Sequence, residues 1–343
     1  MTQIPERMRA LVLKEDGFSG RFEGPAIDDA HRWLELAELP VPQPGPGQVL
    51  LRVRRATVNP SDLHFIKGEY GQPRRKGTPA GFEGCGDVVA AGPGAEGLLG
   101  RRVAFVATPD GSGAWADYAL TAASAAIPLA DAVSDADGAA LIVNPLTAMA
   151  MIDLAAEGSP AVVLTAAGSQ LGKLMIALAR DRDLAPIAVI RRAEQAPALE
   201  ALGAAEVLVT TAPDFRERAA AAMRAHKPRV LLDAVADDVS AALFEAMPAH
   251  ARWVVYGKLD PTPPRVTAMG QLIFMGKRIE GFWLSRWLAE TPRERQAEVV
   301  AEVQRRFADG RWHTDVAAEL PLAEALDRLP EALRAGGKVQ ILP

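Results

Sequence analysis

The sequence predicts an α/β protein in which a doubly wound parallel sheet interrupts a β-rich domain, and three observations support this. Residues 161–164 form a wholly apolar run followed by a turn of small residues and then by apolar residues at helical spacing, which is typical of a buried parallel strand leading into a helix. Residues 8 to about 120 combine strand-like runs with many glycines, as in a bent β domain. A last apolar run, residues 337–342, is expected to return to that domain. We therefore expect one domain from residues 1–124 with 276–343, and a second from residues 125–275.

The first domain is expected to consist mainly of strands. Strand-like runs occupy residues 9–13, 48–56, 84–91 and 101–108, and the second of them alternates in polarity. Connections rich in proline and glycine separate these runs.

The second domain is expected to alternate helices with apolar strands. Residues 135–155 have a helical period broken by Asn144-Pro145, and apolar strands are expected at 187–190, 229–233 and 251–256. Such alternation is typical of a doubly wound parallel sheet. An amphipathic helix is expected over residues 295–310.

Length and composition exclude several classes of protein. The chain has 343 residues, enough for two domains with separate cores, and a formal net charge of −5. No basic stripe is interleaved with aromatic residues, so no nucleic-acid partner is expected. Cys85 is the only cysteine, which excludes an intrachain disulfide and a cysteine-built metal site. The first ten residues lack the apolar core of a signal peptide and no run of about 18 apolar residues occurs, so we expect a soluble cytoplasmic protein without a membrane partner.

The turn after residues 161–164 is a candidate phosphate-binding loop. Strand, tight turn, helix and strand follow each other as in the unit that opens a dinucleotide-binding (Rossmann) fold, where small residues let the backbone approach a pyrophosphate and the helix N-terminus offers free N–H groups. The usual three-glycine frame is imperfect, and the alternative is a structural turn without a ligand. The expected cofactor-binding residues are Ala167, Gly168, Ser169, Gln170, Leu171 and Gly172.

Two arginines follow the second strand of this unit. An acidic residue at that point would bind the ribose 2′-hydroxyl of NAD, whereas arginine accommodates the 2′-phosphate of NADP. Arg191 and Arg192 occupy it, and no acidic residue precedes Glu194. We therefore expect NADPH as the cofactor, against the alternative of a solvated arginine pair. Tyr256, Gly257 and Lys258 follow a later strand and are expected to line the same crevice, although Lys258 also fits a solvated loop.

With these features the chain resembles the medium-chain dehydrogenase/reductase superfamily over nearly its full length. The zinc-dependent branch is disfavoured, because Asn59 and Phe82 occupy positions where that branch has metal ligands. The chain resembles most closely the zinc-independent branch of mitochondrial-type 2-enoyl thioester reductases and quinone oxidoreductases. Three segments carry this resemblance: residues 59–71, residues 143–148, and Gly-Phe-Trp-Leu-Ser-Arg-Trp at 281–287, the most specific of the three.

The resemblance implies a GroES-like catalytic domain that brackets the cofactor domain, with no metal. It implies that Asn144 and Thr147 lie near the cofactor, against the alternative of a helix break set by Pro145. It also implies that the 281–287 segment lines the cleft, although its aromatic residues fit a packing role equally well. The residues expected there are Phe282, Trp283 and Leu284 for the cofactor, and Trp283 and Trp287 for the substrate.

Reduction of an α,β-unsaturated thioester needs a hydride, stabilisation of the enolate oxygen and a proton. Tyr70 is the candidate proton donor, or a hydroxyl that orients the carbonyl; the alternative is an ordinary turn tyrosine. Asn59 is the second candidate catalytic residue, because its amide fits a carboxamide or a substrate carbonyl. It fits an Asn-Pro turn nearly as well.

The sequence therefore predicts an NADPH-dependent enoyl thioester reductase. The alternatives are an NADPH quinone or enone reductase and a non-catalytic NADPH-binding protein. The basic triplet at 74–76 fits coenzyme A phosphates or an acyl carrier protein, or else a solvated surface. A homodimer is expected through the apolar segment 265–275 at a sheet edge.

Overall fold

The computed structural model describes residues 4–343 and divides the chain into two compact units. Unit 1 comprises Met1–Val143 and Gln304–Pro343, and unit 2 comprises Asn144–Val303. These boundaries differ from the expected ones at 125 and 276. The reason lies in strand pairing: β7 (Ala126–Pro128) pairs with β5 in unit 1, and β13 (Arg278–Gly281) extends the parallel sheet of unit 2.

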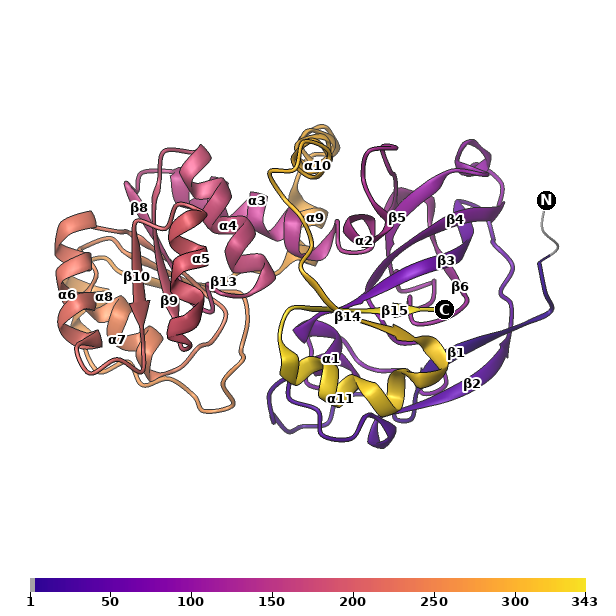
Figure 1. The fold of residues 1–343 in the computed structure, drawn as a ribbon, viewed down its shortest axis with the longest axis horizontal. Coiled ribbons are helices and arrows are strands. Elements are labelled where there is room, and N and C mark those ends of the chain that lie inside the picture. Colours follow the sequence, from indigo (N-terminus) through magenta and orange to yellow (C-terminus); the bar gives the residue numbers. More distant parts are fainter. Residues whose placement is uncertain (1–3) are drawn as a thin grey trace. The chain divides into compact units, whose positions relative to one another are not determined.

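Unit 1 is organised by a mixed sheet in the order β14-β15-β3-β4-β5-β7, in which β6 also pairs with β3. The C-terminal strand β15 runs antiparallel to β3, with Ile341 opposite Ala56, so the last strand returns to the sheet of the first domain as expected (Figure 1). The other strands of this sheet are β3 (Gln48–Val58), β4 (Glu83–Ala91), β5 (Arg102–Val106), β6 (Tyr118–Ala122), β14 (Val316–Pro321) and β15 (Lys338–Leu342).

A two-stranded antiparallel ladder, short 3-10 helices and three α-helices that lie wholly in unit 1 complete this unit in the described chain. Val49, Leu51 and Val53 of β3 and Val88 of β4 are buried in one apolar core with the fully buried Trp115 and Phe105. The ladder is formed by β1 (Arg7–Leu13) and β2 (Leu34–Pro40), and the helices are α1 (Pro60–Ile66), α2 (Asp135–Gly138) and α11 (Ala325–Ala335).

Unit 2 contains a parallel sheet in the order β10-β9-β8-β11-β12-β13. Its inner strands are short and apolar on both faces, because helices from neighbouring parts of the chain cover them. The strands are β8 (Ala161–Leu164), β9 (Ala185–Ile190), β10 (Glu206–Val209), β11 (Val230–Asp233), β12 (Arg252–Val255) and β13.

The helices of this part of the chain are α3 (Val143–Ala156), α4 (Gln170–Asp181), α5 (Ala196–Ala201), α6 (Phe215–His226), α7 (Asp238–Ala246), α8 (Gly270–Phe274), α9 (Leu284–Glu290) and α10 (Arg293–Ala308). The predicted fold class, a parallel nucleotide-binding sheet inserted into a β-rich domain, is confirmed. In residues 4–343, no helix combines the length and the apolar character needed to cross a membrane.

Candidate cofactor and active site

The predicted phosphate loop connects β8 to α4 in unit 2. Ala166 has a φ of 47°, so the chain turns sharply directly after the strand. Ser169 is the N-cap of α4, and its hydroxyl accepts the N–H of Gly172 at 3.1 Å. The twelve-residue helix that follows directs its N-terminal N–H groups and partial positive charge toward the loop. The loop can therefore bind an anionic group.

Close backbone contact explains the glycines of this loop. A Cβ atom at Gly172 would lie 2.4 Å from the carbonyl oxygen of Ala167, so no larger residue fits without moving the turn. A Cβ at Gly168 would lie 2.3 Å from Oε1 of Gln195. The turn thus packs directly on the helix, and its small side chains leave the backbone accessible as a pyrophosphate requires.

Two further groups of predicted residues follow strands of the same sheet. Arg191 and Arg192 are exposed and directly follow β9, the neighbour of β8. Tyr256, Gly257 and Lys258 follow β12, and a Cβ at Gly257 would lie 2.8 Å from the carbonyl oxygen of Ala234. All these strands are parallel, so their carboxyl ends share one edge with the loop, where ligands bind in open α/β sheets. This edge can hold a dinucleotide.

A buried aspartate organises that edge, and the sequence reading missed it. Asp233, at the end of β11, accepts hydrogen bonds from the hydroxyl of Thr165 and from Nε1 of Trp253 at 2.7 Å. It also accepts the Ser240 hydroxyl at 2.9 Å and two backbone N–H groups. Thr165 in turn accepts the N–H of Ala234 at 2.9 Å. An aspartate that ends an otherwise apolar buried strand was the available signal, because a buried carboxylate needs several donors.

The hydroxyl of Tyr256 lies buried near this aspartate. Burial, and then the negative charge of Asp233, raise the pKa of Tyr256. No residue in the described part of the chain forms a hydrogen bond with this hydroxyl. A buried hydroxyl without a protein partner at the cofactor edge is suited to a ligand oxygen.

The remaining cofactor and substrate candidates lie on α3 and around α9. Asn144 is half-buried and Thr147 is buried, both in the first turns of α3. Phe282 follows β13 and donates its N–H to Val255 at 2.9 Å, while Trp283 is the N-cap of α9. Leu284 and Trp287 are half-buried on α9.

Tyr70 belongs to the segment after α1 in unit 1. It is half-buried, and its ring packs on Phe82 with ring centroids 5.2 Å apart. Phe82 also packs on Phe65 at 5.0 Å. The phenol ring thus packs against an aromatic cluster formed by Phe82 and Phe65.

Asn59 is placed differently from the expectation that its amide serves a ligand. It is buried at the N-cap of α1, its Nδ2 donates to Oε1 of Glu83 at 2.8 Å, and its Oδ1 accepts from the ammonium of Lys338. The side chain therefore belongs to a buried polar cluster, in agreement with the alternative of an Asn-Pro turn residue. Glu83 and Lys338 were missed, because only the fold brings β4 and β15 together around α1.

The basic triplet at 74–76 also needs a correction. Arg74 is buried, and its guanidinium donates to the carbonyl oxygens of Gly17 and Ile66, both at 3.1 Å. Only Arg75 and Lys76 are exposed. Arg74 therefore stabilises the loop around it and is not available to a phosphate.

No group of three or more His, Cys, Asp or Glu residues within 4–343 has an arrangement that could hold a metal ion.

Comparison with known proteins follows the division of the chain. A family model for the alcohol dehydrogenase GroES-like domain matches residues 45–131, and one for zinc-binding dehydrogenase matches residues 171–305. A mitochondrial enoyl-[acyl-carrier-protein] reductase of Bos taurus is 27% identical over 94% of this chain and 84% of its own.

Solved structures give the same grouping. A putative NADPH:quinone reductase from Mesorhizobium loti is 49% identical, covers 100% of both chains and superposes with a TM-score of 0.96. A mycobacterial protein solved in complex with NADPH shares the fold, with 23% identity over 98% of this chain and 100% of that one, and a TM-score of 0.80.

Proposed function

Because the chain belongs to the medium-chain dehydrogenase/reductase superfamily, in its enoyl reductase and quinone oxidoreductase branch, and is an NADPH-dependent oxidoreductase, we propose that it reduces the carbon–carbon double bond of a 2-enoyl thioester. The observation that carries this proposal is the setting of Tyr70. Its phenol ring packs on Phe82, with ring centroids 5.2 Å apart. Such a phenol is suited to protonating or orienting an enolate, and reduction of a 2-enoyl thioester requires that the enolate be protonated.

NADPH, when bound, supplies the hydride that no side chain can deliver. The turn Ala167–Gly172 and the N-terminus of α4 fit its pyrophosphate, and Arg191 and Arg192 fit its 2′-phosphate. The buried hydroxyl of Tyr256 offers a donor to the same ligand.

Tyr70 supplies the proton or the orienting hydrogen bond in this proposal. An unperturbed phenol is a weak acid at neutral pH, but the enolate it serves is a much stronger base. The ring of Phe82 packs on one side of the phenol, and Phe65 packs on Phe82 in turn. Substrate binding falls to the aromatic segment with Trp283 and Trp287.

The decisive experiment compares turnover of crotonyl-CoA with that of a panel of quinones, with NADPH as reductant. We expect crotonyl-CoA reduction, and we expect Tyr70→Phe to lower kcat by about 10²-fold or more, as loss of a general acid does. Tyr118→Phe, a matched change on β6, should leave kcat unchanged. Turnover of quinones alone, or full activity of Tyr70→Phe, would contradict the proposal.

Quinone reduction is the second candidate, favoured by the 49% identity to the putative NADPH:quinone reductase. It needs the same cofactor edge but no proton donor matched to an enolate. Under this alternative, Tyr70→Phe would retain activity on quinones. Binding of NADPH without turnover of either panel would favour a non-catalytic NADPH-binding protein.

The cofactor preference has its own test. Arg191→Ala and Arg192→Ala should raise the KM for NADPH about tenfold while leaving the KM for NADH unchanged, since each removes an ion pair to the 2′-phosphate. Equal effects on both cofactors would place the arginines outside the 2′-phosphate site.

We propose further that two copies of the chain associate along β13. This strand ends the sheet order, and α8, which precedes it in the chain, exposes Ile273 at 75% and Phe274 at 86%. An edge strand and exposed apolar side chains are both suited to contact with a second copy. Sedimentation should give a dimer at micromolar concentration, and Ile273→Asp with Phe274→Asp should give a monomer.

Arg75 and Lys76 remain available to the phosphates of coenzyme A or to an acidic acyl carrier protein. Their joint change to alanine should raise the KM of the thioester and leave that of NADPH unchanged.

A further inference from the structure

The N-terminus of α3 is capped by a side chain from another part of the chain. Oε2 of Glu83, on β4, accepts the N–H of Val143 at 2.8 Å and that of Ile142 at 3.2 Å. The first N–H groups of a helix lack partners within the helix, and a carboxylate there also favours the positive end of the helix dipole. Glu83 thus fixes the point at which α3 begins.

Three buried residues hold this carboxylate in place. Its Oε1 accepts Nδ2 of Asn59 at 2.8 Å, and Oδ1 of Asn59 accepts the ammonium of Lys338. Asp62 accepts the N–H of Asn59 at 2.8 Å and belongs to the same buried group. We refer to Asn59, Asp62, Glu83 and Lys338 as the cap cluster.

The contacts of Glu83 favour its ionised form. Burial raises the pKa of Glu83 and lowers the pKa of Lys338, while the opposite charge of each acts in the other direction. The Glu83 carboxylate accepts hydrogen bonds from the N–H groups of Asn59, Ile142 and Val143, and N–H donors favour the anion. Asp62 is the other titratable group facing this pair. The positive charge of Lys338 opposes the effect of burial on the pKa of Glu83.

The cap cluster also positions Phe82, whose ring packs on Tyr70. Oδ1 of Asp62 accepts the N–H of Phe82 at 2.7 Å, and the Phe82 ring packs on the ring of Tyr70. Phe82 is the residue directly before Glu83 in the chain. One buried group thus sets both the backing of the candidate proton donor and the start of the helix that carries Asn144 and Thr147.

We propose that Glu83 is a positioning residue for the reductase reaction. Its carboxylate, with Lys338 and Asn59 beside it, fixes the start of α3 and so supports NADPH binding. The same cluster fixes the position of the Phe82 ring that packs on Tyr70. The proposal rests on the proposed function for the role of Tyr70. It goes beyond that function by assigning a role to a residue that contacts neither the candidate cofactor loop nor the candidate proton donor.

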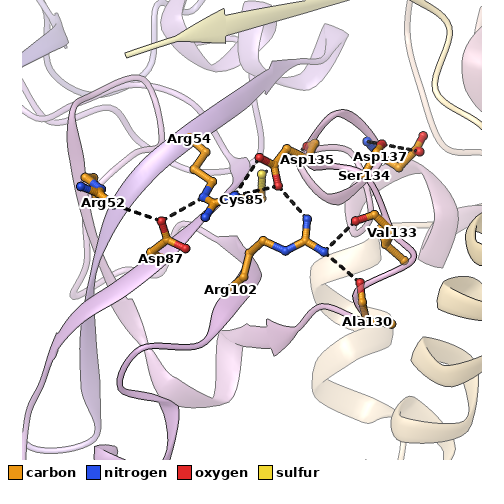
Figure 2. Close-up of polar contacts among 10 residues, drawn as sticks. All are labelled: Arg52, Arg54, Cys85, Asp87, Arg102, Ala130, Val133, Ser134, Asp135 and Asp137. Atoms are coloured by element: carbon orange, nitrogen blue, oxygen red, sulfur yellow. Dashed lines mark hydrogen bonds and ion pairs between the residues drawn. The ribbon is translucent and has the colours of Figure 1, made fainter.

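A second set of contacts holds the preceding segment independently. Arg102 donates to the carbonyl oxygens of Ala130 and Val133, at 2.9 and 2.7 Å, and to the carboxylate of Asp135 at 2.7 Å (Figure 2). Arg54 donates to the same carboxylate at 3.0 Å. Loss of the Glu83 charge should therefore disturb the start of α3 without releasing residues 130–135.

The test compares Glu83→Gln and Glu83→Asp with Leu51→Ala, a core change on β3 of unit 1 that lowers the melting temperature without touching the cap cluster. We expect both Glu83 variants to raise the Kd for NADPH, followed by nicotinamide fluorescence, and to lower kcat, each about tenfold. Leu51→Ala should change neither. Lys338→Arg, which keeps the charge, should remain within about threefold of the parent for both quantities.

The two readouts separate this proposal from the proposed function. If the parent protein does not reduce crotonyl-CoA, the proposed function fails, and the Kd for NADPH still decides the role of Glu83. A parent-like Kd in either folded Glu83 variant would overturn the positioning role. The positioning role would also be overturned if Leu51→Ala raised the Kd for NADPH in the same proportion to its loss of melting temperature as the Glu83 variants do. Glu83 would then act only through stability. If Glu83→Gln does not fold, Glu83→Asp, which keeps the charge, decides alone.

Discussion

Two sets of charged contacts join the segment before α3 to strands of unit 1, and these sets differ in their exposure to water. The arginine network around Asp135 lies at the surface, with the Arg54 side chain 41% exposed and that of Asp135 30% exposed (Figure 2). The cap cluster is buried, with Glu83 1% exposed and Lys338 5% exposed. Water can replace a lost partner in the first set and cannot reach the second. Contacts of similar geometry should therefore differ several-fold in their effect on stability.

The largest effect is expected from Lys338→Met, which removes the buried cation of the cap cluster and leaves Glu83 without it. The free energy of unfolding should fall by about 3–5 kcal/mol, as in other broken buried ion pairs. Urea unfolding followed by circular dichroism measures this. Lys76→Met, at an exposed lysine, is the matched control and should change little. A loss below about 1 kcal/mol would mean that water reaches the cluster.

A pH effect is expected from Asp62. Burial raises its pKa from 3.8 to about 7, against the opposing effect of the N–H groups of Asn59 and Phe82. Above pH 4 the unfolded chain loses this proton while the folded chain retains it, so the contribution of Asp62 to stability is greatest below pH 4. That contribution should fall by about 1.4 kcal/mol per pH unit up to pH 7.

The matched measurement is the same pH series on Asp62→Asn. Subtracting it from the parent series removes the carboxylates that both proteins share. The difference should change steadily between pH 5 and pH 7 in favour of the variant, and a constant difference would show that Asp62 does not titrate in this range.

A smaller effect is expected from Arg102→Ala. Its side chain is 20% exposed and joins Asp135 to two carbonyl oxygens. Loss of these charge-assisted hydrogen bonds should cost about 1.5–3 kcal/mol in unfolding free energy. If Arg102→Ala and Lys338→Met lowered the free energy of unfolding equally, the proposed contrast between the arginine network and the cap cluster would be wrong.

The smallest effect is expected from Arg54→Ala. Its own side chain is 41% exposed, so its ion pairs with Asp87 and Asp135 are partly solvated and the cost should be below about 1 kcal/mol. Because its pairs are exposed, 0.5 M salt should shrink this cost further, whereas the cost of Lys338→Met should persist. Equal salt dependence of the two would contradict the comparison.

The same contrast explains what the sequence predicted. Buried parallel strands such as residues 161–164 appear as apolar runs, because burial on both faces demands apolar side chains, and the loop with Gly172 follows from local spacing. The strand at 278–281 was placed in the other domain, since a short edge strand with exposed residues has no apolar pattern.

Long-range polar contacts were not predictable in the same way. Glu83, Lys338 and Asp233 carry no local pattern, because their partners are brought to them only by the fold. Arg74 looked like part of a basic surface run for the same reason, and its burial depends on carbonyl groups of the distant loop around Gly17.

The position of Cys85 has a practical consequence. This sole thiol donates to the carbonyl oxygen of Asp135 behind the arginine network, and burial raises its pKa to about 12 (Figure 2). Alkylating reagents and peroxide attack thiolates, so the native chain should be inert to both. A cysteine introduced at any exposed site would then be the only reactive one, and a spectroscopic probe could be attached there without first removing a native thiol.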